Sequence, residues 1–182
     1  FTVDAVGGEV GVGTSTPSSL LHVYKDGPSA DEVLFRVSTS TGSTYGNVFN
    51  VDEDGDIFYD GSASSPAADY AEYFFTVDAD LVSGEVVCVD VTRENAVERC
   101  TRASDGNVMG IISTKPAILG NAPEGRGDDA NYVIVGMLGQ VPAKVTTENG
   151  DVRPGDSLTA ASVPGYVMKA NAGDPTVGVA LE

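Results

Sequence analysis

Residues 49–57 read Phe-Asn-Val-Asp-Glu-Asp-Gly-Asp-Ile and repeat residues 1–10, Phe-Thr-Val-Asp-Ala-Val-Gly-Gly-Glu-Val, once a single residue is skipped. The shared pattern is Phe-x-Val-Asp, followed by a glycine, an acidic residue and an aliphatic residue. Because side chains alternate along a strand, Phe and Val share one face, and the glycine lets the chain reverse. The repeat predicts two β-hairpins, at 1–17 and 49–66, each ending in a small-residue turn and a proline.

A lone hairpin is too small to bury its own apolar face. In a fibre, the missing neighbours can come from other copies of the same chain. We therefore expect residues 1–68 to form a fibre region that assembles as a homotrimer. Further strands are predicted between the repeats, at 20–24 and 33–37.

Short valine-rich runs separated by turn residues continue from residue 69 to the end, as in Glu85-Val-Val-Cys-Val-Asp-Val91. This pattern predicts an all-β protein in which residues 69–182 form one compact domain, a barrel or a β-clip. Residues 66–74 are expected to be a short helix or turn, and 119–131 an exposed loop. The strands are expected at 84–91, 96–102, 107–113, 132–138, 140–146, 157–160, 165–170 and 176–181.

The composition excludes several kinds of partner. The 182 residues include 27 acidic and 10 basic side chains, which give a formal net charge of −17. A nucleic-acid or anionic-membrane partner is not expected, because phosphate groups are bound by clustered lysine and arginine. No apolar run approaches the roughly 20 residues of a membrane-spanning helix. Phe1 is neither an initiator methionine nor the start of a signal peptide, so a fragment or a processed chain is expected.

The two cysteines, Cys88 and Cys100, flank a polar turn near Glu94. A hairpin centred on Glu94 places them opposite each other, so they form either a cross-strand disulfide or two buried thiols. The only histidine, His22, is remote in sequence and is expected to be packed or hydrogen-bonded. No metal site and no cofactor are predicted.

One stretch, Gly11-Val-Gly-Thr-Ser-Thr-Pro-Ser-Ser-Leu-Leu-His-Val23, resembles an element of phage tail-fibre and related surface-fibre proteins. A second set of motifs resembles the intramolecular-chaperone autoproteolytic domain of phage neck-appendage proteins: Asp69-Tyr-Ala-Glu-Tyr-Phe74, Gly110-Ile-Ile-Ser-Thr-Lys-Pro116 and Gly120-Asn121. The second resemblance implies a domain that trimerises the fibre and then cuts the bond before the aspartate. It assigns the cleavage to Asp69 and Glu72. Ala68 stands where the family has serine, which bears on cleavage and not on trimerisation.

The spacing of Asp69 and Glu72 is open to two interpretations. On a helical turn, residues i and i+3 share one face, where like charges separate the two pKa values and provide an acid and a base. Alternatively, Asp69 caps a short helix and Glu72 completes a capping box.

Two other stretches carry clustered acidic residues. The run from Asp52 to Asp56 lacks the ligand spacing of a calcium loop and is predicted to be a solvated hairpin turn. The loop 119–131 is a candidate for receptor or glycan binding, through Arg126, Asp128, Asp129 and Tyr132.

The sequence therefore favours a structural fibre or appendage protein, located on a virion surface or outside the cell, over a metabolic enzyme. Its expected partners are two further copies, other virion or fibre proteins, and a host surface glycan or receptor. The alternatives are a chaperone that cleaves itself once at Ala68–Asp69, a receptor-binding fibre tip, and a cellular surface filament.

Overall fold

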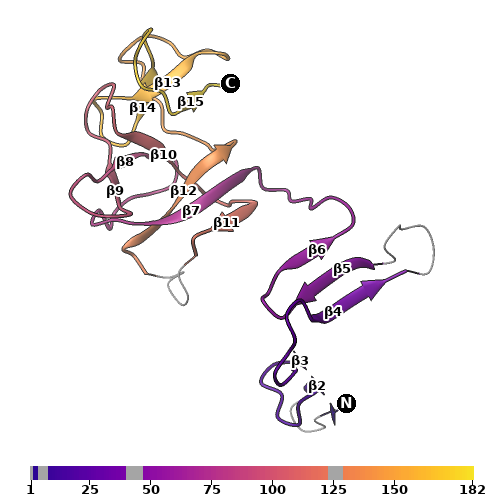
Figure 1. Ribbon diagram of the computed structural model, residues 1–182. Coiled ribbons are helices and arrows are strands. Elements are labelled where there is room, and N and C mark those ends of the chain that lie inside the picture. The colour runs from indigo at the N-terminus through magenta and orange to yellow at the C-terminus, as the bar shows by residue number, and fades with distance from the viewer. Residues whose placement is uncertain (1, 4–7, 40–46, 123–128) are drawn as a thin grey trace. The chain divides into compact units, whose positions relative to one another are not determined.

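The computed structural model describes residues 2–3, 8–39, 47–122 and 129–182 (Figure 1). Every regular element in these ranges is a β-strand, which confirms the predicted all-β class. Within the same ranges, no helix has the length and apolar character needed to cross a membrane. The chain divides into two units, Phe1–Ser64 and Ser65–Glu182. The repeats predict a boundary between residues 68 and 69, four residues further along the chain.

The first unit contains two three-stranded sheets. In one sheet, β2 pairs antiparallel with β1 and parallel with β3. In the other, β5 lies between β4 and β6 and pairs antiparallel with both. The strands are β1 (Thr2–Val3), β2 (Val10–Val12), β3 (Leu21–Val23), β4 (Val33–Ser38), β5 (Asn47–Asp52) and β6 (Ile57–Tyr59).

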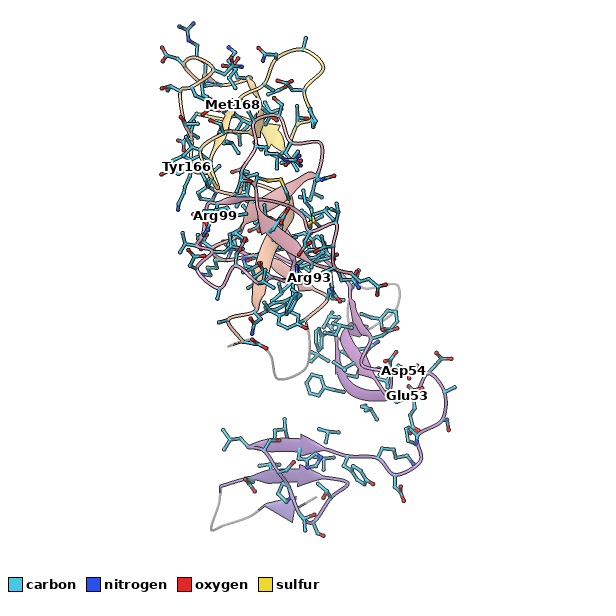
Figure 2. All side chains as sticks on the ribbon, turned by 90° about the vertical axis from the view of Figure 1, so that its left-hand side faces the viewer. Glu53, Asp54, Arg93, Arg99, Tyr166 and Met168 are labelled. Atoms are coloured by element: carbon cyan, nitrogen blue, oxygen red, sulfur yellow. A yellow bond between two sulfur atoms is a disulfide. The ribbon has the colours of Figure 1, made fainter. Side chains whose placement is uncertain are left out.

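The described strands of the two repeated stretches pair antiparallel with the same register. Val3 pairs with Val10, and Val51 pairs with Ile57 at the equivalent position of the second repeat. In the second turn Gly55 has a φ of 85°, and the backbone N–H of Asp56 donates to Asp52 Oδ1 at 2.8 Å. The Asp52 carboxylate therefore stabilises a hairpin turn, in which Glu53 and Asp54 are labelled in Figure 2.

The second unit is built on an open six-stranded sheet and a three-stranded sheet. The strand orders are β11-β7-β12-β10-β8-β9 and β14-β13-β15. All neighbours are antiparallel except β11 and β7. The strands are β7 (Asp69–Phe75), β8 (Val86–Val89), β9 (Val97–Arg99), β10 (Val108–Ile112), β11 (Ile118–Gly120), β12 (Tyr132–Gly139), β13 (Ser157–Ala160), β14 (Val167–Lys169) and β15 (Gly178–Val179).

Three local predictions for this unit were wrong. Residues 69–75 form strand β7 and not a helix or turn, because β11 and β12 pair with both of its edges. Residues 140–146 form no strand and make one isolated bridge, between Val145 and Val167. Strand β11, at residues 118–120, includes the first two residues of the predicted loop 119–131. Of the two predicted arrangements, a barrel or a β-clip, the closed barrel does not form among the described strands, because β11 and β9 are the edges of an open sheet.

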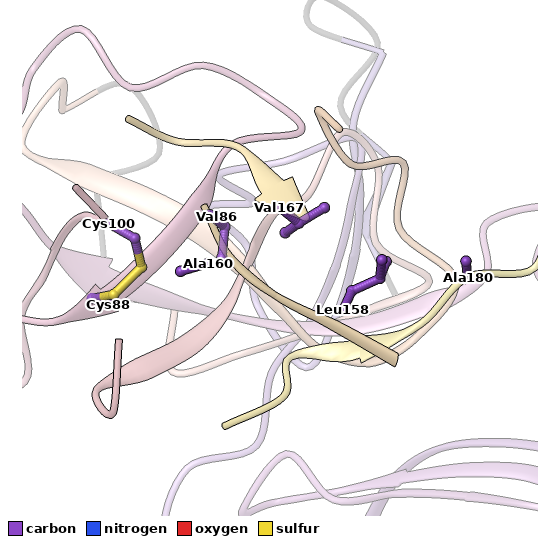
Figure 3. Close-up of a cluster of buried hydrophobic side chains, with 7 residues drawn as sticks. All are labelled: Val86, Cys88, Cys100, Leu158, Ala160, Val167 and Ala180. Carbon is purple, nitrogen blue, oxygen red and sulfur yellow. A yellow bond between two sulfur atoms is a disulfide. The ribbon is translucent and has the colours of Figure 1, made fainter. Parts of the chain in front are cut away.

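The disulfide between Cys88 and Cys100 lies in the cluster of apolar side chains that joins the two sheets (Figure 3). Both cysteines are buried, and Val86, Val167 and Ala160 pack in the same cluster. The β8–β9 hairpin is centred on Arg93, one residue before the predicted centre, so that Cys88 lies opposite Glu98. The disulfide therefore links a diagonal pair, with Cα atoms 5.1 Å apart. A short loop closed in this way stabilises the fold by about 3 kcal/mol.

A buried carboxylate, Glu85, ties three segments of the second unit together. Its Oε1 accepts a hydrogen bond from Lys144 Nζ at 2.9 Å, and its Oε2 accepts one from Arg99 Nε at 3.1 Å. The Val82 N–H also donates to Oε2, at 3.3 Å. Burial raises the pKa of Glu85, but the hydrogen bonds from Lys144, Val82 and Arg99 outweigh burial and hold the pKa below its ordinary value.

We expect Glu85→Gln to lower the free energy of unfolding by about 2 kcal/mol at pH 7, because hydrogen bonds to a charged group are lost. Since the folded-state pKa lies below the unfolded value of 4.5, the contribution of the ionised Glu85 is complete above pH 4.5 and disappears as the pH falls further. Denaturant unfolding from pH 3 to pH 7, roughly spanning that transition, measures both effects. The exposed Glu94→Gln is the control. If the free energy of unfolding differed between wild type and Glu85→Gln by the same amount at every pH, the prediction would be contradicted.

Candidate functional site

The candidate site surrounds the peptide bond between Ala68 and Asp69, where β7 begins shortly after the boundary between the two units. Gly139, at the end of β12, lies opposite Asp69 and has a φ of 116°. A Cβ atom at Gly139 would lie 2.2 Å from the Ala68 carbonyl oxygen and 2.8 Å from Asp69 Cα. Only glycine allows the two backbones to approach this closely.

Two backbone N–H groups hold this peptide in place. The Gln140 N–H donates to the carbonyl oxygen of Ala68 at 3.4 Å, and the Ala117 N–H donates to that of Asp69 at 2.7 Å. The carbonyl of the Ala68–Asp69 bond is therefore next to a donor that can stabilise negative charge on its oxygen.

The Asp69 side chain is buried, with 5% of its surface exposed, and its Oδ2 has no hydrogen-bond partner. A Cβ at Gly136 would lie 3.3 Å from Oδ2, so the missing side chain makes room for the carboxyl group. Burying a carboxyl oxygen without a partner is costly, and such groups are frequent at functional sites. Asp69 thus places a buried, unpartnered carboxyl oxygen beside its own N-terminal peptide bond.

Glu72 lies on the other face of β7, because residues three apart on a strand point to opposite sides. It accepts a hydrogen bond from the Tyr70 hydroxyl at 2.5 Å, and Gly120 leaves room for that hydroxyl. The hydrogen bond to Glu72, burial and the charge of Glu72 all raise the pKa of Tyr70. Both predicted geometries, the carboxylate pair on one helical turn and the capping box, are therefore wrong.

The residues of the predicted binding loop are only partly described. Arg126 and Asp128 lie outside the described residues. Asp129 holds the turn before β12, where its Oδ1 accepts hydrogen bonds from the backbone N–H and the side-chain amide of Asn131, both at 2.9 Å. Tyr132 begins β12 and packs edge-to-face against Phe75, with ring centroids 5.8 Å apart.

His22 belongs to the first unit. Its Nδ1 accepts a hydrogen bond from the Ser18 N–H at 3.3 Å, and its ring packs against Tyr24. Among the described residues, no group of three or more His, Cys, Asp or Glu side chains could hold a metal ion.

An apolar groove adjoins the Ala68–Asp69 bond, and the sequence prediction missed it. It has a volume of about 730 Å³ and includes Ala68 and Gly136 in its lining. Its walls are residues 137–143, at the end of β12 and directly after it, and residues 177–182. The available signal was the absence of charged residues from Asn131 to Ala143 in a strongly acidic chain.

No protein-family model and no curated protein sequence matches this chain. A solved structure, that of the pre-mature bacteriophage phi29 gene product 12, is similar, with a TM-score of 0.54 and 14% sequence identity. The likeness covers 74% of this chain and 24% of the phage chain, so this chain spans about a quarter of the length of that protein. At this identity the likeness shows a shared fold.

We expect Gly139→Ala to destabilise the second unit by about 3 kcal/mol, because the added Cβ meets backbone atoms and adopts a left-handed φ. Gly150→Ala is the matched control, since Gly150 has a φ of 94° but nothing within 4 Å of an added Cβ. Gly150→Ala should lower the free energy of unfolding by about 1 kcal/mol. Thermal and denaturant unfolding measure the stability of both variants. An equal loss of free energy of unfolding in both would show that the close approach of Gly139 to the Ala68–Asp69 backbone is unimportant.

Proposed function

We propose that this chain is a structural component of a phage appendage, exposed on the virion surface, and that it assembles as a homotrimer. The exposed apolar residues of β6 carry the proposal. Ile57, Phe58 and Tyr59 are consecutive and each is more than half exposed. Consecutive strand residues point to opposite faces of a sheet, so β6 presents apolar side chains on both faces of its sheet.

The position of β6 strengthens this argument. It is an edge strand of its sheet, and β4 at the other edge also exposes Phe35 and Val37. Exposed apolar edge strands promote association, and closed symmetric assembly covers them. Further copies of the same chain are therefore the natural partners of the hairpin region.

The second unit supports the role of an assembly domain. Its two sheets share a core that includes a disulfide, so each copy contributes a stable unit to the proposed assembly. The fold likeness to gene product 12 of a bacteriophage favours a virion component with other virion proteins as neighbours.

A second candidate function is a single self-cleavage at Ala68–Asp69. It is favoured by one observation, the unpartnered Oδ2 of buried Asp69 beside a peptide bond whose carbonyl accepts the Gln140 N–H. In this reaction one water is consumed, the bond between the Ala68 carbonyl carbon and the Asp69 nitrogen breaks, and a new carboxylate and amino group form. Cleavage there would separate the hairpin region from the second unit.

The trimer proposal predicts a mass of three chains of 18.7 kDa, about 56 kDa, in dilute solution. Light scattering coupled to size exclusion measures it. Phe58→Glu should weaken the assembly, because contact between the copies would then bury a charged carboxylate in place of an apolar ring. Val77→Glu is the control, as Val77 has a similar exposure in the second unit. A wild-type protein that remains monomeric at micromolar concentration would rule out the proposal.

The cleavage proposal predicts a fragment that begins at Asp69 in assembled wild-type protein and none in Asp69→Asn. Intact-mass spectrometry of freshly folded protein detects both. Loss of cleavage in Glu72→Gln would indicate action on another copy, because Glu72 lies on the face of β7 opposite its own Asp69. Only intact wild-type chain after assembly would eliminate self-cleavage and leave the structural proposal unaffected.

A further inference from the structure

The apolar groove beside Ala68 is an unusually exposed surface. Leu138 on one wall is 76% exposed, and Leu181 on the other is 67% exposed. Val179, Val145 and Met137 are also exposed and line the same groove. Among the described residues that line it, Glu182 alone is charged. Contiguous apolar surfaces with a polar rim mark interaction sites in soluble proteins.

The strand register extends this surface beyond the groove. Leu138 lies opposite Tyr70, and Tyr70 lies opposite Ile118 on the edge strand β11. Residues directly opposite each other share one face of a sheet, so these three side chains form a row across three strands. Ile118 is 62% exposed, like Leu138 at the other end of the row. The row and the groove share Leu138, which lies opposite Tyr70 and also lines the groove.

The charge distribution identifies the occupant. Each chain carries a formal charge of −17, so two copies repel each other wherever acidic residues face one another. The stretch from Asn131 to Ala143, which provides β12 and one wall of the groove, contains no charged residue. Residues 175–181, which provide most of the opposite wall, contain none either. This surface is where copies of an acidic chain can approach each other at the lowest electrostatic cost.

We infer that the surface formed by the groove and the row Leu138–Tyr70–Ile118 is the contact between copies of this chain in the second unit. The inference rests on the proposed self-assembly and adds its location. In a three-fold ring, each copy presents one surface to the next and a different surface to the previous one. The groove and the row Leu138–Tyr70–Ile118 provide the two different surfaces that such a ring requires.

The test compares two full-length variants that each add one carboxylate. Leu138→Glu introduces it at the centre of the proposed contact. Val91→Glu introduces it in the β8–β9 turn, where Val91 is 71% exposed and does not line the groove. We expect Leu138→Glu to weaken the trimer at least about tenfold, and Val91→Glu to retain it. Analytical ultracentrifugation gives the masses, and circular dichroism verifies that the variants are folded.

Three results separate the inference from the assembly proposal. A monomeric wild type overturns both. A wild-type trimer with equally trimeric Leu138→Glu and Val91→Glu overturns the location alone. A trimer whose groove still binds an apolar fluorescent dye, in proportion to the number of chains, also overturns the location, because the groove is then free for another ligand.

If Leu138→Glu fails to fold, Leu181→Glu replaces it. Leu181 lines the opposite wall and follows the last strand, so its substitution leaves the sheet pairing intact. A folded, dissociated Leu181→Glu supports the inference, and a fully trimeric one overturns it.

Discussion

The fold of the second unit depends on packing its two sheets against each other through a core made mostly of small side chains. Among the described residues, the largest that are fully buried are valines, together with Thr76, Thr159 and the two cysteines. Each contributes little apolar area, so the close fit of Val86, Val167 and Ala160 around the disulfide decides whether the sheets stay together. Glu85 complements this core, since its two cationic partners connect the start of β8 with a distant segment and with β9.

Glycines determine how closely β7 approaches its neighbours. Gly136 and Gly139 on β12 lie against Asp69, and Gly120 on β11 lies against Tyr70. Without side chains at these positions, β7 fits between two strands, and the carboxyl group of Asp69 is enclosed beside its own peptide bond. The same arrangement separates Glu72 from Asp69, because strand geometry places them on opposite faces. The carboxyl group and the Ala68–Asp69 peptide therefore depend on one set of backbone contacts.

Acidic charge and exposed apolar surface occur together in this protein and have complementary effects. A charge of −17 keeps chains apart, whereas the apolar side chains of β6 and of the groove favour contact at a few uncharged places. In the proposed assembly, association is thus restricted to these surfaces. This combination suits a protein that has to assemble in one register and remain dispersed otherwise.

The sequence by itself determined the all-β class and the antiparallel pairing of the repeated stretches, because alternation and glycines act over a few residues. It brought Cys88 and Cys100 close together but left open whether they form a disulfide or two buried thiols. Only the tertiary structure decided that residues 69–75 are a strand, that Cys88 lies opposite Glu98, and that Leu138, Tyr70 and Ile118 form a row. These features depend on pairing between segments up to about seventy residues apart, whose register no local pattern encodes. The position of Asp69 beside Gly139 follows from the same long-range pairing.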